Sequence, residues 1–432
     1  MTEERLLTVK TRISKKTLKY VLLLLLYFRP AVYVLGSSVY RVGTAGLIVE
    51  LFYLVLVALL KHRNNHYQLS GVAGMLLMIF SWCLMGSTVL NYFSGTDVSF
   101  NDAITYTATA AGFILLVDLG ISDSSKTFLK SFVIVGSLAC FINAITIFLY
   151  AGRGGMNQSA ILSGGHQTYY FLAEDNATMY WSWPVIVVMW LYFFLFNNSK
   201  NMLAWNIVCT VTICAAYVFV RSLTAMLGTV ALIFLVFHYR KAGNKKRKRR
   251  GIHFRQGSPQ FYFYWIFAVF VNYIVAVLQS WTKYAYLLEL YFNRSATASG
   301  RTTIWERSLY YIKQSWLIGF GQETREYSIS KLRINHTHNF LLETFYRGGA
   351  VAAVMWVILF IHLSQKSKKV HNQIYSFLML AVFLFLLMAV VDFAYYRYPY
   401  LILFILLGHT EVFKGEGRLT FYFDKRNRGN LR

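Results

Sequence analysis

The stretch that decides the fold is FLKSFVIVGSLACFINAITIFLY, Phe128 to Tyr150, in which Lys130 is the one charged residue. Coiled as an α-helix, it is longer than the hydrocarbon layer of a bilayer, which is about 30 Å thick. It lacks the alternation of polar and apolar residues that a transmembrane β-strand needs. The stretch therefore predicts an α-helix that crosses a membrane.

Similar apolar runs recur along the 432-residue chain, and hydrophobic residue types make up 56% of it. Soluble proteins average about 45–50%. We therefore predict an all-α polytopic membrane protein, a single membrane-embedded domain over residues 1–432, with about twelve transmembrane helices. The predicted spans are residues 20–38, 43–60, 69–90, 103–119, 128–150, 179–197, 203–220, 222–238, 261–281, 349–364, 374–394 and 399–413.

The chain is strongly basic, with a formal net charge of +25. Its lysines and arginines concentrate in alternate polar segments, above all in 239–260, which contains the basic run from Lys245 to Arg250. This is the pattern of the positive-inside rule, and it explains the charge without a nucleic-acid partner. The same rule predicts that both termini lie in the cytoplasm.

Two predicted exterior segments, 151–178 and 282–348, are much longer than ordinary turns. The second is rich in Trp, Tyr and Ile, a composition that argues against disorder. Loops of this length are often functional. We expect the long extracytoplasmic loop 282–348 to be helical and to carry the active site.

Within this loop, SGRTTIWERSLYYIKQSWLIGFG, Ser299 to Gly321, has the spacing of an amphipathic helix. Thr303 and Glu306 match a capping box, and we expect the helix to lie along the membrane surface. Arg301 precedes the first turn, where a guanidinium and unpaired N–H groups would bind an anion such as a phosphate. The alternative is that Arg301 only packs, or pairs with a nearby glutamate.

The loop ends in INHTHNFLLETFYRGG, Ile334 to Gly349. Its apolar spacing predicts a helix beginning near Thr337, with His338 in the first turn. The positive end of the helix dipole would keep that imidazole neutral and able to take a proton from a sugar hydroxyl. His338 is therefore the candidate base, unless it is only a structural histidine. Asn339 could orient a ligand or cap the helix.

The pair His336 and His338 also raises the question of zinc. The nearest acids, Glu326 and Glu343, do not stand at a recognisable ligand spacing. The four cysteines all fall in apolar runs and lack zinc-ligand spacing as well. We predict no metal site.

Three further arginines are candidates for binding a pyrophosphate. Arg29 lies within the first predicted span, where a charge costs about 3 kcal/mol or more, so we expect it to face a wet cavity. Arg221 lies between the seventh and eighth spans, and Arg397 lies near Asp392 between the last two. Snorkelling to the membrane surface is the alternative for Arg221 and Arg397. The predicted substrate-binding residues are Arg221, Arg397, Arg29, Asn339 and His336.

Three segments carry a family pattern. HTHNFLLETFYRGG contains H-N-x(9)-G, GRTTIWERSLYYIKQSWLIGFG contains G-R-x-x-x-W followed by G-x-G, and VRSLTAMLG is close to an S-R-T-A helix start. These motifs resemble those of the O-antigen ligase and Wzy-type polymerase superfamily. The matching positions are His338, Asn339, Gly349, Gly300, Arg301, Trp305, Gly319 and Gly321.

The resemblance implies a metal-independent, membrane-embedded glycosyltransferase of the GT-C type, without cofactors, in a bacterial inner membrane. Such an enzyme moves a glycan from undecaprenyl pyrophosphate to a hydroxyl outside the cytoplasm. Arginines, Arg301 among them, would hold the pyrophosphate, and His338 would be the base. The implied partners are an undecaprenyl-pyrophosphate-linked oligosaccharide and the lipid bilayer, and a chain-length regulator is a further candidate.

One departure from the family pattern bears on the type of enzyme. The ligases place an arginine where this chain has Leu223, and here the cation is two residues earlier, at Arg221. On a helix this is a rotation of about 200°. The departure favours a repeat-unit polymerase for a surface polysaccharide, either O-antigen or capsule. The alternatives are a ligase that transfers polymer to lipid A core and a flippase for lipid-linked oligosaccharide.

Overall fold

The computed structural model describes residues 14–31, 37–151, 155–156, 169–173, 177–220, 222–245, 260–279, 300–370, 372–395 and 397–414. Within these ranges the regular structure is helical, apart from an isolated antiparallel bridge between Val98 and Glu323. The prediction of an all-α protein is therefore confirmed.

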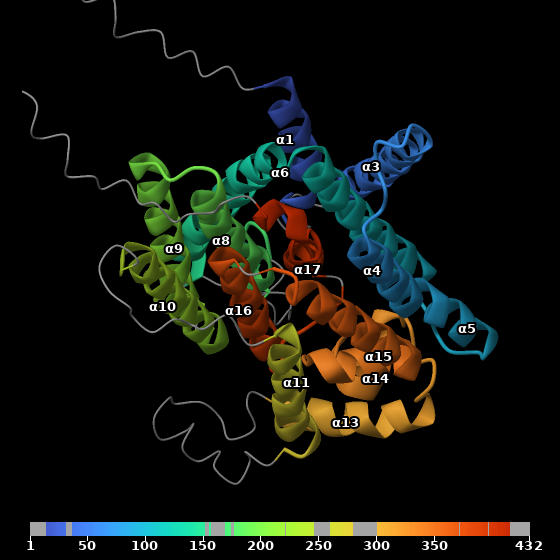
Figure 1. Cartoon of the computed structure of the whole chain (residues 1–432). Coiled ribbons are helices and arrows are strands. Elements are labelled where there is room, and N and C mark those ends of the chain that lie inside the picture. The colour runs from blue at the N-terminus through green and yellow to red at the C-terminus, as the bar shows by residue number, and fades with distance from the viewer. Residues whose placement is uncertain are drawn as a thin grey trace, which may run out of the picture.

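Figure 1 shows how the helices are arranged, with α13 and α14 together at one end of the bundle. The long helices are α1 (Lys15–Tyr27), α3 (Ser37–Arg63), α4 (Gly71–Ser81), α6 (Phe100–Tyr150), α8 (Thr178–Leu195), α9 (Lys200–Phe219), α10 (Leu223–Lys245), α11 (Phe261–Asn272), α13 (Arg301–Gln314), α15 (Phe340–Ser367) and α16 (Gln373–Met388). The shorter elements are η2 (Trp82–Gly86), α5 (Ser87–Phe93), η4 (Tyr273–Val277), α14 (Arg325–Leu332), η6 (Tyr398–Tyr400), α17 (Leu401–Gly408) and η7 (Thr410–Phe413).

Six of the described helices are long and apolar enough to cross a membrane, which confirms a polytopic membrane protein. They are Arg41–Arg63, Gly71–Phe93, Phe100–Tyr150, Thr178–Leu195, Lys200–Phe219 and Phe340–Ser367. Four shorter apolar helices accompany them, at Leu223–His238, Phe261–Val277, Gln373–Met388 and Tyr398–Gly408. Every predicted span overlaps a helix, but the count of twelve crossings stays a prediction.

The helix α6 joins two predicted spans in one element of 51 residues. It breaks at Ser124, whose φ of −169° and ψ of 95° are not helical. The polar segment predicted between the spans, 120–127, is thus a kink rather than a loop. Asp123 beside the kink forms ion pairs with Lys16 at 2.8 Å and with Lys61 at 3.1 Å.

These ion pairs bring together three segments that the charge pattern predicts to be cytoplasmic. At the other end of the bundle, the backbone N–H of Ser99 donates to Gln322 O at 2.9 Å, which joins two predicted exterior segments. Segments predicted to share a side of the membrane therefore do lie together. The termini themselves, 1–13 and 415–432, lie outside the described residues.

The core is built around α6 and α8. The helix α6 packs against α1, α3, α8 and α9, and α8 also contacts α16 and η6. Tyr180 on α8 meets the stacked rings of Phe385 and Tyr400, whose centroids are 4.8 Å apart. In contrast, α3, α9, α10 and α11 expose large apolar side chains such as Phe52 and Phe234, as lipid-facing helices do.

The helix α15 is interrupted at Gly349, whose φ of 63° and ψ of −161° lie outside the helical region. Segment 316–321 runs beside this break and uses the exposed backbone groups. Ala350 N donates to Trp316 O at 2.8 Å, and Gly321 N donates to Arg347 O at 2.9 Å. A Cβ at Gly349 would collide with the backbone of Leu317, so this family-pattern glycine has a steric reason to be there.

Two predicted helix starts differ from the structure. The helix α13 begins at Arg301 after Gly300, whose φ is 84°, and has no side-chain cap, so the capping box of Thr303 and Glu306 was wrong. The helix α15 begins at Phe340 rather than near Thr337. Asn339 sets that start, because its side chain accepts a hydrogen bond from Leu342 N at 2.9 Å.

Candidate active site

A cluster of two histidines and a carboxylate forms where the turn before α15 meets the turn after α16. His338 Nδ1 lies 2.9 Å from Asp392 Oδ1. His336 Nε2 lies 3.1 Å from His338 Nδ1, and His336 Nδ1 lies 2.7 Å from Asn335 Oδ1. The cluster thus runs in one chain of contacts from Asn335 through both rings to Asp392.

The backbone of His338 explains how its ring reaches Asp392. His338 has a φ of 54°, in the left-handed region that residues other than glycine seldom adopt. Thr337 is held by a bond from its N–H to Glu343 Oε2 at 2.8 Å, and Asn339 is fixed as the cap of α15. The strained residue therefore sits between two anchored neighbours, an arrangement common at functional sites.

The hydrogen bonds assign the protons in this cluster. Burial, followed by the neighbouring His338 ring, holds the pKa of His336 well below its usual value, so His336 is neutral. Its one ring hydrogen is on Nδ1, facing the side-chain oxygen of Asn335, and Nε2 is an acceptor. His338 Nδ1 must then carry a hydrogen, shared between Asp392 and His336. Nε2 is therefore the ring nitrogen of His338 that could accept a proton.

Asp392 is an ionised partner for this histidine. Burial by itself would raise the pKa of Asp392, but the charge of Arg397 and the neighbouring imidazoles, with the hydrogen bond from His338, hold it well below its usual range. Arg397 Nη1 lies 3.0 Å from Asp392 Oδ1, and the guanidinium lies 4.9 Å from the centre of the Tyr180 ring. A carboxylate fixed in this way would stabilise a positive charge on His338.

The same three donors also have a spacing that could hold a divalent cation. His336 Nε2, His338 Nδ1 and an Asp392 oxygen lie within 4.8 Å of one another. The sequence gives no sign that Asp392 joins the histidines, because it lies 54 residues beyond His338. Arg397 already supplies the cation for this buried carboxylate, so a divalent ion would be opposed by a guanidinium. The absence of a metal stays a prediction.

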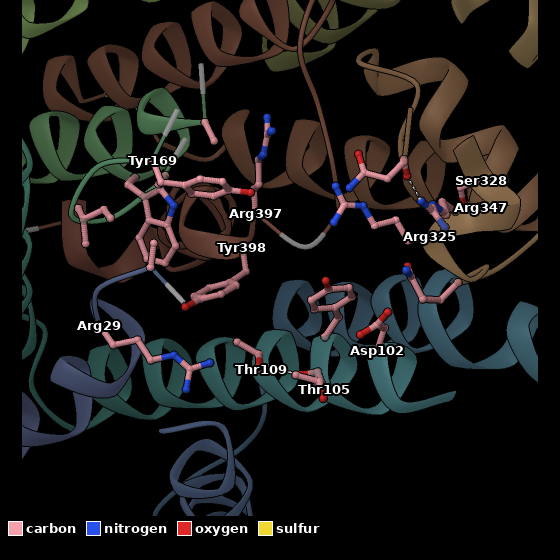
Figure 2. Close-up of a pocket in the computed structure, with 18 of the residues that line it drawn as sticks. Arg29, Asp102, Thr105, Thr109, Tyr169, Arg325, Ser328, Arg347, Arg397 and Tyr398 are labelled. Carbon is pink, nitrogen blue, oxygen red and sulfur yellow. Dashed lines mark hydrogen bonds between the residues drawn. The ribbon is translucent and has the colours of Figure 1, made fainter. Parts of the chain in front are cut away.

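A cavity of about 330 Å³ opens beside the cluster, within the size range of small-molecule sites. Asn335 and Arg397 belong both to its wall and to the contacts of the cluster. Figure 2 labels four arginines among the residues that line the cavity. They are Arg29, Arg325, Arg347 and Arg397. Aromatic rings line it too, from Tyr106, Tyr169, Trp181 and Tyr398.

The predicted arginines are only partly brought together. Arg29 and Arg397 both line the cavity, and Arg29 Nη2 donates to Thr44 Oγ1 at 3.1 Å. Arg29 follows the end of α1 at Tyr27 rather than lying inside a helix. Arg301, on the first turn of α13, is not among the residues of the cavity wall. Arg221 lies outside the described residues.

Asn339 and His336 have roles inside the protein. Asn339 is completely buried, caps α15, and donates from Nδ2 to Asn272 Oδ1 at 2.7 Å and to Val390 O at 2.6 Å. This bears out the cap alternative for Asn339 and leaves its amide engaged with protein groups. His336 is 1% exposed and contacts His338, and neither histidine is among the residues of the cavity wall.

Sequence reasoning missed several charged groups of the site. Arg347 is buried and donates to Glu343 Oε1 at 3.1 Å, to Gly321 O and to Asn335 O, so it shapes the wall. The spacing of Glu343 and Arg347 on one helix face was an available signal. Asp102 and Arg325 also line the cavity, and no local pattern marks them as partners because they come from distant helices.

Residues 178–357 match the family model described as O-antigen ligase. The matched region runs from the start of α8 into α15 and includes Arg301 and His338, whereas Arg29 and Asp392 lie outside it. No curated protein and no solved structure gives a significant match. The helical membrane fold and this match agree with the motif resemblance and support the O-antigen ligase and Wzy-type polymerase superfamily, whose members are glycosyltransferase-like membrane enzymes.

Proposed function

We propose that this protein is a surface-polysaccharide polymerase that joins lipid-linked repeat units of O-antigen or capsule. The donor would be a growing glycan on undecaprenyl pyrophosphate, and the acceptor a sugar hydroxyl of a second lipid-linked repeat unit. The observation that carries the proposal is the His338–Asp392 pair beside an arginine-lined cavity. A base and an anion site side by side are what transfer from a pyrophosphate to a hydroxyl requires.

In the proposed reaction the acceptor hydroxyl oxygen attacks the anomeric carbon of the donor sugar. His338 Nε2 takes the hydroxyl proton, and Asp392 stabilises the imidazolium that results. The new carbon–oxygen bond replaces the bond to pyrophosphate, whose oxygen leaves with the electron pair. The products are a glycan longer by one transfer and free undecaprenyl pyrophosphate.

The departing pyrophosphate gains negative charge, and guanidinium groups suit its oxygens in geometry and charge. Arg397 and Arg29 are supported for this role by their places on the cavity wall. Arg301 is supported by the family motif, in which it is the arginine that follows Gly300. Arg221 stays a candidate pyrophosphate ligand because of its motif alone. No step in this scheme needs a metal ion or another cofactor.

A ligase is the second candidate, since the matching family model is described as O-antigen ligase. It would use the same base and the same donor, and would differ in the acceptor, such as lipid A core. The flippase alternative needs no base, so the ordered contacts of His338 and Asp392 speak for an enzyme.

The setting of the reaction belongs to the same proposal. The protein would lie in a bacterial inner membrane with about twelve spans in a GT-C-like arrangement, both termini in the cytoplasm and the loop 282–348 outside. The contacts of Asp123 with Lys16 and Lys61 support this sidedness, because they join segments predicted to be cytoplasmic. A chain-length regulator is a proposed partner.

The test is reconstitution of the purified protein in lipid with undecaprenyl-pyrophosphate-linked repeat units as the only substrate, followed by a glycan gel. A ladder of products is expected from a polymerase. Product that forms only after lipid A core is added would indicate the ligase. If neither condition yields a new glycosidic bond, the enzyme proposal is wrong and transport becomes the better hypothesis.

A further inference from the structure

The two ends of the cavity are chemically different. Figure 2 shows Arg29, Arg397 and Tyr398 towards one side, and Asp102, Arg325 and Ser328 towards the other. A carboxylate repels a pyrophosphate but accepts hydrogen bonds from sugar hydroxyls. The side that carries Asp102 also carries Arg325, so it presents one charge of each sign, whereas the other side presents the arginines Arg29 and Arg397. The side with the two arginines is therefore the better place for the pyrophosphate, and the side with Asp102 suits a ligand that both accepts and donates hydrogen bonds.

Backbone pairing builds this second end of the cavity. Residues 97–99, just before α6, run beside residues 322–324, just before α14. Ser99 N donates to Gln322 O at 2.9 Å, and Thr324 N donates to Asp97 O at 3.2 Å. Thr324 Oγ1 also donates to Asp97 Oδ2 at 2.7 Å. The first turns of α6 and α14 are thereby tied together next to the cavity.

Each of these first turns contributes a charged side chain to the wall. Asp102 lies in the first turn of α6, and Arg325 opens α14. Neither forms an ion pair with another described residue, whereas the neighbouring Glu323 is paired with Lys331 at 2.7 Å. Asp102 does accept a hydrogen bond from Ser99 Oγ at 2.9 Å, but this uses one carboxylate oxygen. Asp102 and Arg325 thus offer an acceptor and a donor group to the cavity.

Neutral hydrogen-bonding groups surround this pair. The wall between the two helices also includes Thr105, Thr109 and Ser328, whose hydroxyls can donate and accept, and the ring of Tyr106. Planar charged groups, hydroxyls and an aromatic face together are suited to the alternating hydroxyls and C–H faces of a sugar. The wall continues through Asn335 to the His338 cluster, so a sugar held here would be near the base.

We propose that the part of the cavity between the first turns of α6 and α14 is the acceptor-sugar subsite, with Asp102 and Arg325 as its selecting residues. The proposal rests on the proposed function and specifies its acceptor. The sugar is one with neighbouring hydroxyls, because Asp102 offers an acceptor and Arg325 a donor to the same part of the cavity. Asp102 accepts from one hydroxyl and Arg325 donates to another.

The test uses the repeat-unit oligosaccharide released from its lipid as a soluble acceptor, with the lipid-linked donor held at a fixed concentration. In Asp102→Asn and Arg325→Gln, the KM for this acceptor should rise about 10-fold or more, since hydrogen bonds to charged groups are lost. The KM for the donor should stay within about twofold. Glu326→Gln is the matched control, because Glu326 is exposed on the same turn of α14 and is not on the cavity wall.

Calorimetric binding of the same oligosaccharide to wild type and to Asp102→Asn provides a readout that needs no turnover. Weaker binding to the variant supports the subsite. Equal binding, or an acceptor KM that does not change in either variant, overturns it. The wild-type protein could also bind the sugar more tightly than Asp102→Asn and yet form no glycosidic bond. That result would overturn the proposed function but would still support the sugar subsite.

Discussion

At the scale of single residues, the basicity of His338 depends on which ring nitrogen carries the hydrogen. Nδ1 faces an oxygen of Asp392 at 2.9 Å, and a carboxylate can only accept. Nδ1 therefore keeps its hydrogen and Nε2 keeps the lone pair. An asparagine at position 392 could donate instead, which would select the opposite tautomer and place the hydrogen where the substrate proton should go.

Asp392→Asn should therefore lower kcat by about 100-fold or more and change the KM for the lipid-linked repeat unit by less than about threefold. Steady-state kinetics of the reconstituted enzyme would measure both. Glu306→Gln makes the same carboxylate-to-amide change on the exposed side of α13 and should behave like wild type. A large rise in KM with kcat preserved would mean that Asp392 binds substrate rather than orients the base.

His338→Ala removes the base and should leave no detectable polymer, with expression and membrane insertion unchanged. Arg301→Ala should also stop polymer formation, because it removes a cation that the family motif assigns to the pyrophosphate. Glycan gels of cells that express each variant would report both outcomes. Normal polymer length in either variant would remove that residue from the proposed site.

At the scale of elements, the break at Gly349 divides α15 into two parts with different surroundings. Its first part positions His338 and Arg347, and its second part is a membrane span, with Gly349 between them. The backbone groups exposed by the break are satisfied by segment 316–321. This places the end of the exterior loop against the wall that contains Arg347.

Gly349→Ala should destabilise the protein by about 2 kcal/mol or more, because the new Cβ would collide with the backbone of Leu317 at a φ of 63°. Activity should fall with it, since the displaced segment supports Arg347. Gly95→Ala is the control, since Gly95 also has a positive φ but a Cβ added there would meet no other atom within 4 Å. Equal thermal unfolding temperatures for the two variants would contradict this account.

A second element-scale feature lies just beyond the apolar helix Tyr398–Gly408, where His409 follows the end of α17. His409 Nε2 lies 2.7 Å from Asp118 Oδ1, and its other nitrogen contacts Glu411. Burial opposes the charged ring, but the hydrogen bonds to Asp118 and Glu411 outweigh it and raise the pKa of His409 to about 9. The imidazolium therefore fastens α17 to α6.

This pKa predicts a pH-dependent stability. Because the folded value of about 9 lies above the ordinary value of 6.5, the stabilisation is complete below pH 6.5 and is lost as the pH rises through 9. The difference amounts to about 3 kcal/mol. Thermal unfolding in detergent should weaken from pH 6.5 to 9.5 in wild type and less steeply in His409→Gln. Parallel curves for the two proteins would contradict the role of His409.

At the scale of the whole molecule, the sequence predicted the features that depend on residues close together in the chain. Apolar length predicted the spans, and charge predicted which polar segments share a side, as the contacts of Asp123 illustrate. The sequence singled out the motif histidine but misplaced the start of the following helix. Asn339 rather than Thr337 precedes the helix, and its side chain is held by Asn272 and Val390, which are distant in sequence. Asp392 could not be joined to His338, nor Asp102 placed beside Arg325, because the two residues of each pair lie far apart in sequence.

The sidedness of the whole protein can be measured directly. The exterior loop should expose Ser330, whereas Asn64, in the exposed turn between α3 and α4, should face the cytoplasm. A cysteine at position 330 should react with a membrane-impermeant maleimide in intact spheroplasts, and a cysteine at position 64 only after permeabilisation. Native Cys83, Cys140 and Cys209 are buried and Cys214 is half-buried, so the unsubstituted protein is needed as the control for background labelling. The reverse pattern would put His338 on the cytoplasmic side, where an exported glycan could not reach it.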